Sequence, residues 1–259
     1  MRGISTPNVK SPLLSYETGV HIGDGTLSYS AEKAMYAIYF SGDLIEDFYF
    51  FNFTIKNIIK KLYGVEPITA FIENKRSISL RVYSKNLFMF KRDVIGLPVG
   101  PKVEMRNVIS KNIELGEENI SNLIAGLFDT DGCFKTFRKG EKIYPQVRMS
   151  NKSPIFSDIK AFLDLKGISS TLYKRPDMIN VLDINGNKNT KSFFNSIPSR
   201  NIKHLTKYII WCASKTIPSP KIEDRIKLLN LSKEDVVGIS TDIDNLNLSH
   251  LIERTSMGL

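Results

Sequence analysis

Two Asp-Gly pairs are the residues of this sequence best placed to do chemistry, because each ends an apolar stretch with helical periodicity. The first closes the segment YETGVHIGDG (16–25), and the second closes LIAGLFDTDG (123–132). One Asp-Gly pair after a helix is usually only a capping turn. Two copies that open the same succession of elements predict equivalent roles for Asp24 and Asp131.

Small residues line one side of both apolar stretches. Gly19 and Gly23 lie four residues apart in the first stretch, as Gly126 and Thr130 do in the second. Residues with this spacing share a helix face, and helix backbones approach closely only where side chains are small. We therefore expect the two helices to pack about an approximate two-fold axis that brings both Asp-Gly pairs together.

Two carboxylates at such a junction repel each other unless a divalent cation or a cationic group shares the site. Mg²⁺ prefers oxygen ligands of this kind, and water and substrate phosphate oxygens usually complete its shell. Asp24 and Asp131 therefore predict a site for Mg²⁺, or for Mn²⁺ in its place.

The elements around the two motifs follow one plan twice: helix, hairpin, helix, hairpin, helix. In the first half, we expect strands at 26–30, 35–41, 68–73 and 78–84, and helices at 43–64 and 85–96. In the second half, we expect strands at 133–139, 143–150, 170–175 and 179–184, and helices at 153–167 and 187–196. Pro154 should occupy the first turn of its helix, and Gly167 should end it.

The fold class that follows is α+β, with two pseudo-symmetric αββαββα repeats. Their antiparallel sheets form a saddle, with the two motif helices packed at its centre. The predicted divisions are a first repeat at 1–98 with its motif helix at 13–25, a linker at 99–118, a second repeat at 119–200 with its motif helix at 120–132, and a C-terminal helical extension at 201–259. A chain of 259 residues is long enough to bury a sizeable core in each half.

Charge and strand alternation together indicate the partner. The chain holds 36 Lys and Arg against 27 Asp and Glu, a net charge of +9, which favours polyanions. Alternation directs one set of apolar side chains toward the helices: Ile38, Phe40, Ile78, Leu80 and Val82. The opposite sheet face is polar and partly basic, and strand ribbons fit the major groove, so the expected partner is double-stranded DNA.

Other classes of protein are disfavoured. No uninterrupted apolar run is long enough to span a bilayer, and the N-terminus lacks the apolar core of a signal peptide. Cys133 and Cys212 offer neither a disulfide framework nor metal-ligand spacing. We expect an intracellular, cytoplasmic protein without a membrane partner that is associated with the nucleoid when bound to DNA.

LIAGLFDTDG closely resembles the signature of the LAGLIDADG homing endonucleases, and YETGVHIGDG resembles a diverged first copy of it. The two-fold plan over roughly residues 11–200 is similar to that of the single-chain, two-motif members of the archaeal intron-encoded kind, which act as monomers. The first acidic position of the family motif is Asp129 in the second copy but Ile22 in the first. The acidic position before the closing glycine is occupied in both copies, which favours an active enzyme.

The resemblance implies a site-specific homing endonuclease that binds a long asymmetric DNA target. It would hydrolyse one phosphodiester in each strand across the minor groove with divalent metal and leave 3′ overhangs. Asp24 and Asp131, with the backbone carbonyl groups of Gly23 and Thr130, would hold the cations that activate water and stabilise the leaving 3′ oxygen. An RNA maturase that assists intron splicing, or a non-catalytic DNA-binding regulator on the same scaffold, are the alternatives.

The resemblance also implies outer catalytic positions, since family members place a basic residue near each attacking water. Lys102 fits this position after the first repeat and Lys203 after the second, with Arg200 as the alternative to Lys203. Gln146 and Arg148 stand where the family often has polar catalytic helpers, whereas the first repeat has Ala37 and Tyr39 there.

The expected DNA contacts are outward strand and turn residues, some recognising base edges and others only neutralising phosphates. They are Ser28, Ser30, Tyr39, Lys75, Arg76, Arg81, Lys135, Arg138, Lys139, Arg148, Lys174 and Arg175. The alternation in CFKTFRKG (133–140) is irregular, so a bulge could move Arg138 to the other face. The unequal halves predict an asymmetric target.

Overall fold

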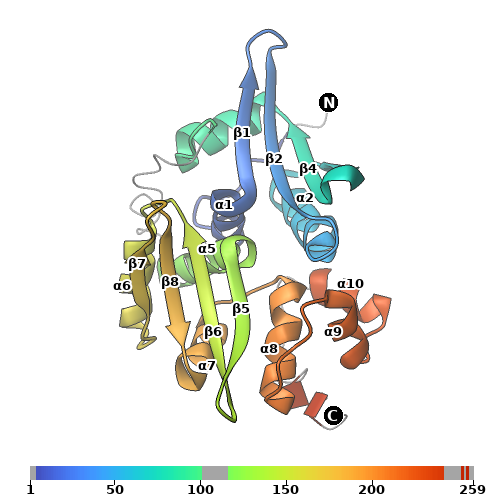
Figure 1. The fold of residues 1–259 in the computed structure, drawn as a ribbon. Coiled ribbons are helices and arrows are strands. Elements are labelled where there is room, and N and C mark those ends of the chain that lie inside the picture. The colour runs from blue at the N-terminus through green and yellow to red at the C-terminus, as the bar shows by residue number, and fades with distance from the viewer. Residues whose placement is uncertain (1–3, 101–115, 242–251, 254, 257–259) are drawn as a thin grey trace.

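The computed structural model describes residues 4–100, 116–241, 252–253 and 255–256 (Figure 1). The first repeat consists of α1 (Pro12–Asp24), β1 (Gly25–Ser30), β2 (Met35–Asp43), η1 (Phe50–Ile55), α2 (Lys56–Tyr63), β3 (Ile68–Ile72), η2 (Glu73–Lys75), β4 (Ser77–Tyr83), α3 (Lys85–Met89) and η3 (Phe90–Ile95). The second repeat consists of α5 (Gly116–Asp131), β5 (Gly132–Lys139), β6 (Lys142–Asn151), α6 (Phe156–Leu165), β7 (Thr171–Lys174), β8 (Asn180–Asn185) and α7 (Asn187–Ser196).

Each repeat contains one four-stranded antiparallel sheet with the same strand order, β1-β2-β4-β3 in the first and β5-β6-β8-β7 in the second. In both sheets the strand that follows the motif helix lies at one edge and its hairpin partner lies inside. The predicted α+β class and the two-fold repeat of elements are confirmed. Among the described residues, no helix combines the length and the apolar character needed to cross a membrane.

The predicted inward face of the first sheet is confirmed. Its five expected side chains are all buried: Ile38, Phe40, Ile78, Leu80 and Val82. Phe50 and Phe51, from the aromatic run FYFFNF, are also fully buried in the same core. Burial of each such side chain stabilises the fold by roughly 1.5–3 kcal/mol, so this run contributes to the core that supports the sheet.

Two helices differ from their expected bounds for local reasons. The helix expected from Asp43 starts later, because Asp43 is the last residue of β2 and its Oδ1 accepts hydrogen bonds from Ile45 N and Glu46 N, both at 2.9 Å. That turn delays the helix, which then passes through a π-helical stretch, η1, before α2. Pro154 lies before α6 rather than in its first turn, since Ser153 Oγ accepts from Ile155 N at 3.4 Å in a preceding turn.

The motif helices pack against each other at the centre of the molecule (Figure 1). A Cβ atom built on Gly19 would lie 2.9 Å from Leu127 N, and one built on Gly126 would lie 2.8 Å from Val20 N. The two close approaches are reciprocal, as an approximate two-fold axis requires. The small-residue stripe therefore has the role predicted from the sequence, because only glycine leaves room for the facing backbone.

A buried ion pair also fixes α1 against the other helices of the first repeat. Lys91 Nζ lies 2.6 Å from both carboxylate oxygens of Glu17, and Tyr63 Oη donates to Glu17 Oε2 at 2.8 Å. All three residues are essentially inaccessible, and burial lowers the pKa of Lys91. A buried charge left without its partner is strongly destabilising, so this contact holds the motif helix in one register against α2 and η3.

The C-terminal extension contacts both repeats. It contains α8 (Ile202–Ser214), α9 (Ile222–Leu228) and α10 (Lys233–Thr241). Trp211 is fully buried, as expected for a core residue, with its ring 6.0 Å from that of Phe134 in β5. On the first repeat, Thr54 Oγ1 donates to Ser240 O at 2.7 Å. The extension thus contacts both repeats and links them. Figure 1 shows one of these contacts, α8 beside β5.

The motif helices lie near their predicted bounds, although α5 begins four residues earlier than the expected helix at 120–132. Glu117 and Glu118 occupy its first turn, where negative charge favours the helix dipole. Residues 99 and 100 contact the first sheet, because Val99 forms a bridge with Leu27 and Gly100 N donates to Leu27 O at 2.9 Å. The rest of the expected linker, up to residue 115, lies outside the described residues.

Candidate active site

Asp24 is the last residue of α1, and Asp131 is the last residue of α5. Close packing of these helices brings their C-terminal ends together. A Cβ atom built on Gly23 would lie 2.6 Å from Thr130 Cβ and 3.4 Å from Asp131 Oδ2. The carboxylate of Asp131 therefore lies against the turn of α1 that ends at Asp24, and both aspartates are partly exposed residues.

The donor chemistry at this junction fits a hard divalent cation. Carboxylate oxygens and backbone carbonyl oxygens are the ligands that Mg²⁺ and Mn²⁺ prefer. The C-terminal ends of two helices also add partial negative charge from their dipoles. The residues Asp24, Asp131, Gly23 and Thr130 supply such oxygens, whereas the described part of the chain holds no group of three or more His, Cys, Asp or Glu side chains suited to a metal.

Asn151, at the end of β6, contacts Asp131 and was missed by the sequence analysis. Its Nδ2 donates to Asp131 Oδ2, while its Oδ1 accepts from Ser153 N at 2.7 Å. The Ser153 contact fixes the orientation of the amide, so that the NH₂ group points to the carboxylate. Only the strand register reveals the contact, because Asn151 lies two residues beyond Met149, the partner of Gly132 in β5.

At the register-equivalent position, the first repeat has a glycine in place of this side chain. Gly25 pairs with Phe40, so the position that corresponds to Asn151 is Gly42. A Cβ atom built on Gly42 would lie 2.9 Å from Phe51 Cδ2, which leaves no room for an amide. The surroundings of Asp24 and Asp131 are therefore unequal.

Asp129, at the first acidic position of the second motif, is fully buried. It accepts hydrogen bonds from Tyr16 Oη at 2.5 Å, from Arg200 N at 2.6 Å and from Ser199 Oγ. Burial raises the pKa of Asp129 to about 6, although the three donors lower it. The contacts join both motif helices to the segment before α8, so Asp129 holds elements in place, and the apolar Ile22 occupies the matching buried position of α1.

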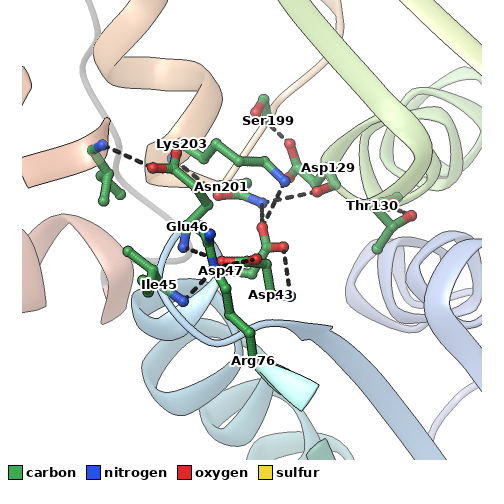
Figure 2. Close-up of polar contacts among 12 residues, drawn as sticks. Asp43, Ile45, Glu46, Asp47, Arg76, Asp129, Thr130, Ser199, Asn201 and Lys203 are labelled. Atoms are coloured by element: carbon green, nitrogen blue, oxygen red, sulfur yellow. Dashed lines mark hydrogen bonds and ion pairs between the residues drawn. The ribbon is translucent and has the colours of Figure 1, made fainter. Parts of the chain in front are cut away.

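Lys203 lies between the repeats (Figure 2). Its Nζ is 2.6 Å from Asp47 Oδ1, and its side chain is 17% exposed. Asn201 Nδ2 donates to the same Asp47 oxygen at 3.3 Å and to Asp129 O at 2.8 Å. The ammonium predicted to assist the attacking water is thus held by an acidic residue of the first repeat. The guanidinium of Arg200, the alternative, lies 4.3 Å from the centre of the Tyr16 ring.

Lys102 lies outside the described residues. Gln146 pairs with Lys135 across β5 and β6, on the outer face of the sheet, and donates to Asn185 Oδ1 at 2.7 Å. Arg148 forms two hydrogen bonds of 2.6 Å with Asp183, which raises the pKa of the guanidinium. Both predicted helpers therefore lie on the expected face but are engaged by neighbouring side chains.

Several of the predicted DNA contacts of the first repeat lie on the outer sheet face or in a turn, as expected. Tyr39 pairs with Arg81, and Ser28 lies on the same outer face by register. Ser30 also shares that face at the end of β1, while Lys75 lies in the turn between β3 and β4. Arg76, at the same turn, forms an ion pair with Asp43 at 3.0 Å.

In the second repeat, Arg175 forms an ion pair with Asp177 at 3.0 Å, and Lys174 ends the edge strand β7. The expected outward position of Arg138 is wrong, although no bulge forms in this hairpin. The β5–β6 register runs without interruption from Gly132 opposite Met149 to Lys139 opposite Lys142. Strict alternation therefore puts Arg138 on the face of the buried Phe134, although its own side chain is exposed near the hairpin tip.

Comparison with known proteins agrees with this architecture. Residues 118–198 match the family model described as the LAGLIDADG-like domain. No sequence among the curated proteins is significantly similar to the chain.

Solved structures of two-repeat proteins resemble most of the chain. The structure of I-DmoI in complex with DNA and Mn is 20% identical, with a TM-score of 0.51 over 73% of this chain and 97% of that one. The LAGLIDADG homing endonuclease I-LtrWI, bound to its target DNA, is 10% identical, with a TM-score of 0.53 over 93% and 99%. A variant of I-SmaMI is 11% identical, with a TM-score of 0.51 over 96% and 99%. At these identities the likeness establishes the fold.

Proposed function

We propose that this protein, whose second repeat is a LAGLIDADG-like domain in the two-repeat LAGLIDADG fold, is a site-specific endonuclease of double-stranded DNA. One observation carries the proposal. The packing of α1 and α5 puts the carboxylate of Asp131 against the turn of α1 that ends at Asp24. Two acidic groups at one junction suit phosphodiester hydrolysis, whereas a protein that only binds DNA does not require them.

The proposed reaction depends on a divalent cation, Mg²⁺ or Mn²⁺, held by Asp24, Asp131 and the carbonyl groups of Gly23 and Thr130. When bound, such a cation supplies a nucleophilic water and stabilises charge at the phosphate. Structures of I-DmoI were obtained in complex with DNA and Mn and in the presence of Mg, which supports this choice of metal.

The outer faces of the two sheets would bind the two halves of a long DNA target. The basic surplus of the chain, +9, attracts the phosphates, and the outward strand residues contact base edges in the major groove. The junction between the sheets then faces the minor groove, where both strands are cut and 3′ overhangs remain. We propose that a monomer does this, since one chain contains both repeats.

The outer catalytic roles of Lys102, Lys203 and Gln146 remain part of the proposal. The ammonium of Lys203 forms an ion pair with Asp47 Oδ1 at 2.6 Å, so it would have to leave this contact to reach a water at the scissile phosphate. Gln146 would have to release Asn185 to contact a substrate.

Asn151→Leu is expected to slow cleavage by about 10-fold to 100-fold, the usual cost of losing a side chain that orients a metal-binding group. The leucine keeps the volume of the side chain but cannot donate to Asp131. Cleavage rates of each labelled strand, measured together with the affinity for the uncleaved target, would show the effect.

Asn180→Leu is the matched control. Asn180 Nδ2 donates to Ser153 O at 2.9 Å in the same turn and not to Asp131. The control should cleave within about threefold of the parent protein. Equal slowing by both variants would mean that Asn151 acts only through the turn.

The function itself is tested by incubating the protein with Mg²⁺ and a plasmid that carries the intronless form of its host locus. We expect one double-strand cut near the insertion point, with 3′ overhangs and no cut in the presence of a chelator. A maturase would instead support intron splicing in a variant that lacks both Asp24 and Asp131. Specific DNA binding without any cut would leave only the regulator.

A further inference from the structure

Equivalent positions on the two outer sheet faces carry different chemistry. One row of paired residues crosses the first sheet from β1 to β3: Thr26, Tyr39, Arg81 and Ile68. The equivalent row crosses the second sheet from β5 to β7: Cys133, Arg148, Asp183 and Thr171. Neighbouring side chains in such a row are about 5 Å apart, so each row can contact adjacent base pairs.

The outer face of the edge strand β3 is apolar along its whole length. Register puts Ile68, Ala70 and Ile72 on that face, opposite Arg81, Ser79 and Ser77 of β4. Ile68 is 57% exposed, the most exposed aliphatic side chain among the described strands. The inner face of β3 is different, since Phe71 stacks on Phe48 with ring centres 6.2 Å apart. Ile68 is therefore an exposed apolar residue that packing within the fold does not explain.

The rest of the row offers polar groups for the same surface. Arg81 Nε lies 3.3 Å from Ser79 Oγ, and no carboxylate in the described part of the chain pairs with this guanidinium. In the second sheet, by contrast, Arg148 at the Tyr39-equivalent position is held by Asp183 at the Arg81-equivalent position, with bonds of 2.6 Å. The guanidinium of Arg81 beside the exposed side chain of Ile68 suits a polyanion that also presents apolar groups.

In the major groove, the only apolar group that identifies a base is the C5-methyl group of thymine. Serine and arginine recognise bases through hydrogen bonds, but an isoleucine or alanine side chain has only apolar groups to offer and can identify a base only through this methyl group. From these observations we infer that β3 recognises thymine methyl groups through Ile68 and Ala70, in the half of the target bound by the first repeat. The inference rests on the proposed function and adds the base preference of one half-site.

The test uses synthetic target duplexes in which each thymine in turn is replaced by deoxyuridine. The change removes the methyl group and leaves Watson–Crick pairing intact. Fluorescence anisotropy in Ca²⁺ would give the affinity of the parent protein, of Ile68→Ser and of Leu165→Ser. Serine has no methyl group to contact thymine, and Leu165, 87% exposed on α6, is the matched replacement of an exposed apolar residue by serine.

We expect the parent protein to bind about fourfold more weakly when a sensitive thymine is replaced, the cost of one buried methyl group. All sensitive thymines should lie in one half-site. Ile68→Ser should lose this dependence at one of them, while Leu165→Ser should keep it.

Specific binding that tolerates deoxyuridine at every position would overturn the inference and leave the endonuclease proposal standing. The same holds if Ile68→Ser keeps the full dependence. Failure of the parent protein to bind any DNA would remove both proposals.

Discussion

Asp131→Asn is expected to abolish double-strand cleavage, lowering the rate by about a thousandfold or more, while affinity for the target changes only a few-fold. In the proposed reaction, the metal that this carboxylate would hold stabilises the transition state by several kcal/mol, and each 1.4 kcal/mol corresponds to a tenfold change in rate. Asparagine keeps the shape of the side chain and can still accept from Asn151, but it has no charge to hold the cation. Asp24→Asn should have an effect of the same order.

Single-turnover cleavage of an end-labelled target in Mg²⁺ would measure the rate, and anisotropy in Ca²⁺ would measure the affinity. Asp164→Asn is the matched control, since the side chain of Asp164 is exposed on α6 and, among the described residues, pairs only with Lys160, at 2.8 Å. It should cleave like the parent protein. Substantial activity in either motif variant would remove the chemistry proposed for the helix ends.

Gly126→Ala is expected to destabilise the protein by about 4 kcal/mol or more, within the range of severe core overpacking. The new Cβ would lie 2.8 Å from Val20 N and against Tyr16 O, and neither is a flexible side-chain end. The two helices would have to separate, which would also move Asp131 away from the end of α1. Gly19→Ala should destabilise the protein in the same way, because a Cβ atom there would lie 2.9 Å from Leu127 N in the backbone of α5.

Urea unfolding followed by circular dichroism would measure the free energy. Gly238→Ala in α10 is the control, since a Cβ there would meet no atom within 4 Å and the residue is helical. That variant should be stabilised by as much as about 1 kcal/mol, the helix preference of alanine over glycine. If Gly126→Ala and Gly238→Ala unfolded alike, the helices would not be packed as described.

Local pattern explains why so much of the fold could be predicted. Strand and helix periods depend on residues a few positions apart, and glycine supplies the left-handed backbone that ends α2 at Gly64, with φ 69°. The spacing of Gly19 and Gly23 likewise predicts a close helix approach. For these reasons the sequence by itself was sufficient to predict the α+β repeats, the central helix pair and the convergence of Asp24 and Asp131.

The tertiary structure decided the surroundings of those carboxylates. Asn151 approaches Asp131 through strand register, Lys203 meets Asp47 across 156 residues, and Tyr16 meets Asp129 across 113. Contacts of this kind produce no periodic pattern in the sequence. Each depends on where the packing of the whole chain places two segments that are distant in sequence. The sequence therefore predicted which residues carry the acidic charge, whereas only the folded chain shows which polar neighbours orient it.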